Sequence, residues 1–130
     1  MNPNTHRADT VRAAGLAALL TGSGILHFLR PAGFVAIVPR RLPAKEALVA
    51  VSGAAELGCA VLLVPVRTRR IGGILTAGLF AAVFPANISM ALRSDRRSRR
   101  YQVLAWARLP LQIPLIRWAW QVGARRSTSG

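Results

Sequence analysis

The chain has 130 residues, of which 52% are hydrophobic and only 17% charged, and its 18 Lys and Arg residues against 4 Asp and Glu give a formal net charge of +14. Soluble domains usually carry charge on about a quarter of their residues, which is more than in this chain. The single cysteine excludes an intramolecular disulfide, a Cys-x-x-Cys redox motif and a cysteine-based zinc site. Nearly all basic residues lie between or at the ends of long apolar runs, so we expect a lipid bilayer as the partner and no nucleic acid.

The chain begins with a polar tail, residues 1–10, followed by a first apolar run, residues 11–29. A secretory signal peptide is the competing interpretation of this run, because an arginine precedes it. No A-x-A-type cleavage site follows, however, and three further apolar runs come after it, so we interpret it as the first membrane-spanning helix. Residues 30–45 are too short and too rich in proline to span a membrane. Their apolar middle between arginines predicts a short interfacial segment, with an ordinary loop as the alternative.

The second apolar run, residues 47–66, contains one acidic residue, Glu56, and ends at a proline and a basic cluster. The third, residues 71–92, contains no ionisable residue. At about 1.5 Å per residue it is roughly 33 Å long, which matches a hydrocarbon core of about 30 Å. We expect Pro85 to bend this helix.

The fourth apolar run, residues 101–122, is weaker because Arg108 and Arg117 interrupt it, but aromatic residues lie near its ends, as at membrane interfaces. The tail at about 124–130 is expected to be disordered. Four such runs with short connections predict a single all-α domain over residues 1–130. We expect an up-down-up-down bundle of four transmembrane helices with both termini on one side, here named side A. Basic residues divide almost evenly between side A and the opposite side B, so they predict no orientation.

Small residues spaced four apart predict where these helices approach each other closely. The candidates are Ala14, Ala18 and Gly22; Ala54 and Gly58; Gly73 and Ala77; and Gly78 and Ala82. Such spacing is common in any chain rich in alanine and glycine, so it is a weak indicator of contact faces.

The apolar runs also contain polar side chains that do not belong in hydrocarbon, and alternating helix directions place them in the side-B half of the bilayer. The candidate binding residues are His27, Ser52, Glu56, Asn87, Arg108 and Gln112. A charged residue at the centre of a lone helix costs about 2.5–3.5 kcal/mol. We therefore predict that Glu56 and Arg108 meet as an ion pair or through a water, with Gln112 one turn from Arg108. A small pocket for a headgroup, a quinone-like ring or a proton is one interpretation, and an ion pair that only fixes helix register is the other.

Four stretches resemble the DoxX-like group of small four-helix membrane proteins: GILHFLRPAGFVAIVPRRLP, SGAAELGCAVLLVP, FPANISMAL and ARLPLQIPLIRWAW. The resemblance covers about residues 22–120. It places the family's characteristic positions at His27, Pro31, Pro39, Pro43, Glu56, Asn87, Arg108 and Gln112. It implies a multipass plasma-membrane protein. Some members are named as small subunits of thiosulfate:quinone oxidoreductase, others associate with redox or detoxification complexes, and most have no assigned reaction.

The leading hypothesis is a non-catalytic component of a quinone-linked membrane redox complex, in which partner subunits carry the chemistry. The chain offers no redox centre of its own, because two histidines, His6 and His27, are too few for a pair of bis-histidine haems. No metal site is predicted, and a quinone is the candidate cofactor. One alternative is a small proton-coupled carrier in which Glu56 titrates, which would need a homo-oligomer because the chain shows no internal repeat. The other is a purely structural or chaperone-like membrane protein.

Overall fold

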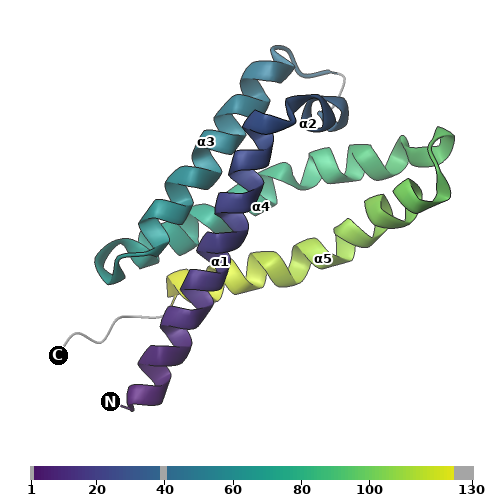
Figure 1. Cartoon of the computed structure of the whole chain (residues 1–130). Helices are drawn as coiled ribbons and strands as arrows, with labels where there is room; N and C mark the ends of the chain where they lie inside the picture. The colour runs from purple at the N-terminus through teal and green to yellow at the C-terminus, as the bar shows by residue number, and fades with distance from the viewer. Residues whose placement is uncertain (1, 39–40, 125–130) are drawn as a thin grey trace.

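The computed structural model describes residues 2–38 and 41–124. Within these residues all regular structure is helical, which confirms the predicted all-α class (Figure 1). The elements in chain order are α1 (Pro3–Leu29), α2 (Pro31–Ile37), α3 (Lys45–Leu63), α4 (Val66–Leu92), the 3-10 turn η1 (Ser94–Arg96) and α5 (Arg99–Ala124). The predicted disordered tail lies outside the described residues except for Ala124, which is the last residue of α5.

The first helix begins at Pro3, so most of the segment expected to be a short polar tail, residues 3–10, is part of α1. Asn2 caps this helix, because its side-chain oxygen accepts a hydrogen bond from the backbone N–H of Asn4 at 3.1 Å. Pro3 suits the first helical position, where its fixed φ is already helical and its missing N–H would have no partner. Hydropathy indicates where a helix enters apolar surroundings rather than where it begins, which explains the late predicted start.

A tight turn separates α3 from α4, and the basic cluster that was expected after the second apolar run lies in the first turns of α4. Side chains from these first turns of α4 cap α3. The Thr68 hydroxyl donates to the carbonyl of Leu62 at 2.7 Å. The Arg69 guanidinium donates to the carbonyls of Leu63 and Val64, both at 3.0 Å. Because the last carbonyls of a helix have no partner within it, these bonds fix the turn.

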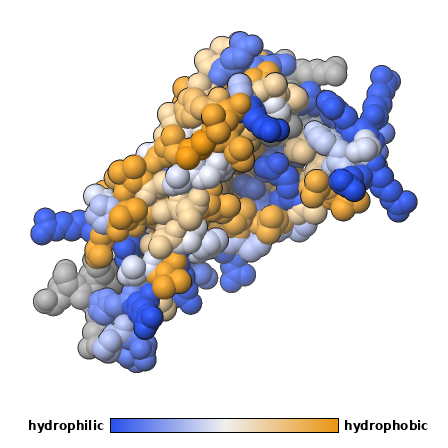
Figure 2. All heavy atoms as spheres, viewed as in Figure 1, coloured by the Kyte–Doolittle hydropathy of each residue, from blue (hydrophilic) through white to orange (hydrophobic). Residues whose placement is uncertain are grey.

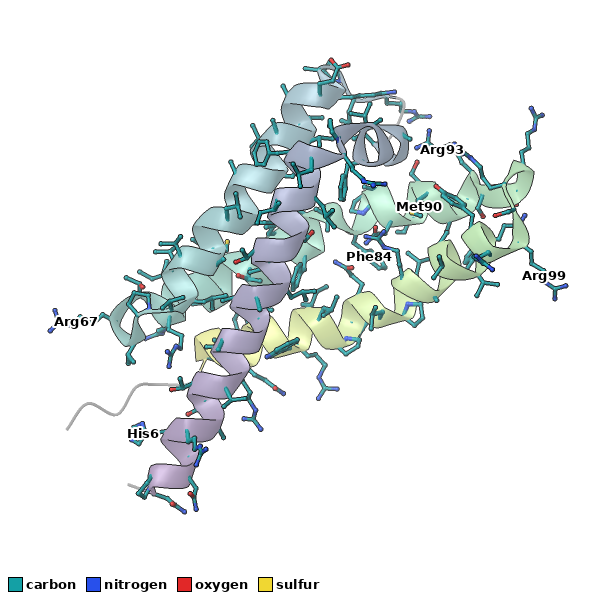
Figure 3. The ribbon with its side chains drawn as sticks, viewed as in Figure 1. His6, Arg67, Phe84, Met90, Arg93 and Arg99 are labelled. Carbon is teal, nitrogen blue, oxygen red and sulfur yellow. The ribbon has the colours of Figure 1, made fainter. Side chains whose placement is uncertain are left out.

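The segment between the first two long helices contains α2, so an ordinary loop is not what forms there. Arg93, at the end of α4, donates to the carbonyls of Ala36 and Val38, both at 3.2 Å. Figure 3 shows Arg93 reaching from α4 toward α2. The chain then enters α3 through Ala44, whose φ of 52° is in the left-handed region that residues with a side chain rarely adopt. The short helix is therefore attached to the end of α4.

The long helices form two antiparallel pairs, α1 with α3 and α4 with α5, and α3 also packs against α4 (Figure 1). Each pair has glycines where the two backbones come close together. A Cβ added to Gly53 on α3 would lie 2.7 Å from the Cβ of His27 on α1. A Cβ added to Gly73 on α4 would lie 2.7 Å from the Cα of Gly123 on α5. The absence of a side chain allows these backbones to come so close.

Most of the small residues predicted at helix contacts face outward instead. Gly73 and Ala77 are buried, as predicted. Gly22, Gly58 and Gly78 face open space, with no described atom beyond their own helix and chain neighbours within 4 Å of an added Cβ. The exposed alanines of the prediction are Ala14, Ala18, Ala54 and Ala82. Four-residue spacing recurs on several faces of each helix, so it could not show which face is buried.

The apolar core lies in the half of the molecule that contains the α3–α4 turn. Its buried members are Ala13, Leu16, Ala17, Leu20, Cys59, Ala60, Leu63, Ala77, Phe80, Ala119 and Val122. Large apolar side chains also cover the outside of the helices, and Val51, Val61 and Val64 are among the most exposed (Figure 2). In the described part of the chain, three helices, α1, α3 and α4, are long and apolar enough to cross a membrane. An apolar exterior of this kind is suited to hydrocarbon rather than to water.

Candidate functional site

A histidine and a glutamate meet where α1 lies against α3. The imidazole Nδ1 of His27 lies 3.3 Å from the Oε2 of Glu56, and each side chain is about 10% exposed. Gly53, three residues before Glu56, faces His27 and leaves it room to approach the carboxylate. A buried carboxylate is unfavourable without a partner, and this contact provides one from another helix.

The neighbours of His27 fix both its tautomer and its orientation. Nδ1 also lies 2.7 Å from the backbone carbonyl of Ser23. Because a carbonyl can only accept, Nδ1 carries the proton and donates it there. The imidazole stacks on the ring of Phe34 from α2, with centroids 3.7 Å apart and planes inclined by 18°. The backbone of α1 therefore holds one edge of the imidazole, and α2 covers one face.

The Oε2 atom of Glu56 is buried, and none of the described residues donates a hydrogen bond to it. The Nδ1 of His27 is close, but its proton is directed at the Ser23 carbonyl. The side chain of Ser23 and the charge of Arg108 also interact with this carboxyl group. A buried acceptor without a donor costs about 1–3 kcal/mol. The site can therefore gain free energy by accepting a hydrogen bond from a ligand.

A second polar pair joins α4 to α5. The side-chain amide of Asn87 donates to the Oε1 of Gln112 at 3.1 Å, and the Nε2 of Gln112 donates to the backbone carbonyl of Phe80 at 2.5 Å. Pro85 lies between Phe80 and Asn87 and removes a backbone donor from α4 in this region. Gln112 is buried and uses both ends of its amide. This pair is thus satisfied within the protein and holds two helices together.

The predicted residues form two pairs rather than one cluster. Glu56 contacts His27, whereas Arg108 is exposed and forms no ion pair within the described residues. The predicted direct ion pair between Glu56 and Arg108 is therefore corrected: the nearest basic group to the Glu56 carboxyl is the imidazole of His27, and Arg108 acts on that carboxyl at longer range. Ser52, one turn before Glu56 on α3, is half-buried and belongs to neither pair in the described structure.

Both pairs lie beyond the apolar core, in the half of the molecule toward α2 and η1. There α4 and α5 diverge from α1 and α3 (Figure 1). Figure 2 shows hydrophilic atoms in the recess between these two arms, surrounded by apolar atoms. Both pairs thus lie in the same half of the molecule, and their placement in the side-B half of a bilayer stays a prediction.

Sequence reasoning missed three contributors to the site. Phe34 lies in the segment interpreted as interfacial, although Pro31 gave a signal, because a proline after a helix end often begins a new helix. That helix places Phe34 over the end of α1, against His27. The carbonyls of Ser23 and Phe80 could not be found, because bonds to the main chain leave no pattern in residue types.

The comparisons with known proteins add a family but no ligand. Residues 16–123 match the family described as "Domain of unknown function (DUF8561)". No curated protein and no solved structure matched the chain. Within the described residues, no group of three or more His, Cys, Asp or Glu side chains is placed to hold a metal ion.

Proposed function

The chain belongs to the family described as a domain of unknown function (DUF8561), and because that description assigns no activity, we propose one from the geometry of the chain itself. The proposal is a multipass plasma-membrane protein that serves as a non-catalytic component of a quinone-linked redox complex. His27 and Glu56 would hold the ligand's headgroup. The observation that carries this proposal is the buried Oε2 of Glu56, which has no donor among the described residues and lies beside a stacked imidazole and phenyl ring.

The proposed architecture is a DoxX-like four-helix bundle in which α5 is the fourth span. With 26 residues α5 is about 39 Å long, more than the hydrocarbon core of about 30 Å. It packs along α4 and shares the buried Asn87–Gln112 contact. Arg108 and Arg117 are costly against lipid. The interaction of Arg108 with the Glu56 carboxyl lowers one of these costs, and a snorkelling Arg117 would lower the other.

A quinol suits this site better than a quinone does. The oxidised ring carries acceptor oxygens only, whereas each hydroxyl of the reduced ring donates a hydrogen bond. One such hydroxyl on the Oε2 of Glu56 would satisfy the atom that the protein leaves without a donor. The flat ring would lie near Phe34 and His27, which are already stacked. Oxidation or reduction of the ligand would take place in partner subunits.

The same pair favours a second candidate, a proton-coupled carrier. A histidine and a carboxylate in contact within a membrane are the groups from which proton relays are built. This function would require Glu56 to gain and lose a proton during transport, and with no internal repeat in the chain it would require a homo-oligomer.

In the third candidate, a structural protein, both polar pairs only hold helices in register.

The test is binding of a short-chain quinol to the full chain in nanodiscs, compared with the matching quinone and the O-methylated quinol. We expect the quinol to bind at least tenfold more tightly than either, because a hydrogen bond to a charged group contributes about 1.5–3 kcal/mol. Glu56→Gln should remove most of this preference. Glu46→Gln, the same change at an exposed position of α3, should leave it intact.

Each alternative gives a different result. If none of the three compounds binds, the quinone-linked proposal fails. Proton flux into vesicles that Glu56→Gln abolishes and Glu46→Gln preserves would then establish the carrier. Absence of both binding and flux in a stably folded chain would support the structural role. Recovery of redox subunits with the wild-type chain from native membranes would support the proposed complex.

A further inference from the structure

Four arginines crowd the turn between α4 and α5. Arg96, Arg97, Arg99 and Arg100 are all exposed. Within the described residues none of them forms an ion pair. The same turn carries one acidic residue, Asp95, so four arginines remain in excess and repel each other unless a further counter-charge is present. The turn therefore has the electrostatic character of an anion-binding surface.

The backbone of this turn is held in place, so the charges are presented together. The side-chain amide of Gln102 donates to the carbonyls of Asp95 and Arg97, at 3.2 and 3.1 Å. The guanidinium of Arg97 lies 5.3 Å from the centroid of the Tyr101 ring. Figure 3 shows Arg99 pointing away from the turn and away from the rest of the molecule.

Exposed apolar side chains adjoin these arginines. Leu92, Val103 and Leu104 are 61%, 59% and 58% exposed. Figure 2 shows hydrophilic atoms gathered around the α4–α5 turn with apolar atoms next to them. A phospholipid can contact both the arginines and the apolar side chains. Its phosphate pairs with arginine, and its acyl chains lie along leucine and valine. RNA would satisfy the charges but not the apolar side chains.

We propose that the α4–α5 turn binds the headgroups of anionic phospholipids, with Arg96, Arg99 and Arg100 on the phosphates. This surface is separate from the His27–Glu56 pair, and its occupation does not depend on a quinol. At the opposite end of α4, Arg69 is already committed to the carbonyls that end α3, while Arg67 and Arg70 are exposed. Fewer exposed arginines gather there than at the α4–α5 turn, so the lipid preference should be stronger at the turn.

The test uses the full chain in nanodiscs made of phosphatidylglycerol and phosphatidylcholine, with native mass spectrometry to count the lipids that stay bound. The variant replaces Arg96, Arg99 and Arg100 by Gln. The control variant replaces Arg7, Arg67 and Arg70, which are exposed arginines at the other end, by Gln. Each basic residue near an anionic surface contributes about fivefold. We expect wild type and control to prefer phosphatidylglycerol, and the turn variant to lose this preference by about tenfold or more.

Salt provides a second measurement that needs no substitution. Raising the salt from about 50 to about 500 mM should reduce the wild-type preference, because salt screens exposed charges. Equal retention of the two lipids by the wild type would overturn the proposal, and so would equal losses in the two variants. Release of the lipid by millimolar inorganic phosphate, or by a short RNA, would overturn it in favour of a free anion or a nucleic acid.

Discussion

Gly53→Ala tests whether the contact between α1 and α3 positions the His27–Glu56 pair. The added Cβ would lie 2.7 Å from the Cβ of His27 and 3.0 Å from a ring carbon of Phe28. Carbon atoms in contact prefer about 3.5–4.0 Å, so the two helices must separate there by roughly 1 Å. Nδ1 of His27 and Oε2 of Glu56 are now 3.3 Å apart. The same displacement would take them to about 4 Å and loosen the contact that places the imidazole beside the carboxylate.

The expected loss of stability follows from two opposing effects. Overpacking of this kind costs about 1–3 kcal/mol. Alanine is a better helix former than glycine by up to about 1 kcal/mol, which offsets part of that cost. We therefore expect Gly53→Ala to lower the free energy of unfolding by about 1–2 kcal/mol. Circular dichroism during unfolding by sodium dodecyl sulfate in mixed micelles measures this difference.

Gly58→Ala is the control, because it makes the same change on the same helix at a position that faces open space. Its stability should equal that of the wild type or slightly exceed it. Quinol binding, measured in parallel, should weaken in Gly53→Ala only. Equal stability of the two variants, with equal ligand binding, would refute the claim that the Gly53 contact positions the pair.

Three further experiments probe other contacts of the fold. A double-mutant cycle of Asn87→Leu and Gln112→Leu in the same unfolding assay should give a coupling free energy of about 0.6 kcal/mol, which is the average for side-chain hydrogen bonds between membrane helices. If the effects of the two single substitutions simply add, the hydrogen bond between these side chains does not contribute to stability. Arg69→Gln should lower stability by about 0.5–1.5 kcal/mol because α3 loses bonds to its last carbonyls, whereas the exposed neighbour Arg67→Gln should have no effect. Arg93→Gln should accelerate amide hydrogen exchange in α2, and exchange at the wild-type rate would disprove its attachment to α4.

The sequence predicted the long helices well because their cause is repeated along the chain. An uninterrupted apolar run such as residues 71–92 has few ways to avoid water other than a helix in a core or a membrane. The ends of the helices depend on single residues instead. Asn2 and Pro3 start α1 by local hydrogen bonding and a fixed φ, and Arg69 closes the α3–α4 turn. Such effects lie outside a hydropathy pattern.

The candidate site was predicted only in part, for a related reason. Glu56 stood out because a buried carboxylate needs a partner, and the structure provides one on another helix. Charge alone favoured Arg108 for that role. The choice of His27 depends on which faces of α1 and α3 meet, and that is determined by the close approach at Gly53. Several small-residue faces were available, and no residue type distinguished the one that is used.

The partner of Glu56 stands earlier in the chain than Glu56 itself, and this has a consequence for biogenesis. A ribosome releases His27 first, then Glu56, and only later Arg108, since domains form from the N-terminus during synthesis. In the proposed membrane topology, the first hairpin would leave the translocation channel with its carboxylate already beside the imidazole of His27, whereas a lone carboxylate would resist entry into lipid. Insertion of α1 and α3 would then not have to wait for the second half of the chain.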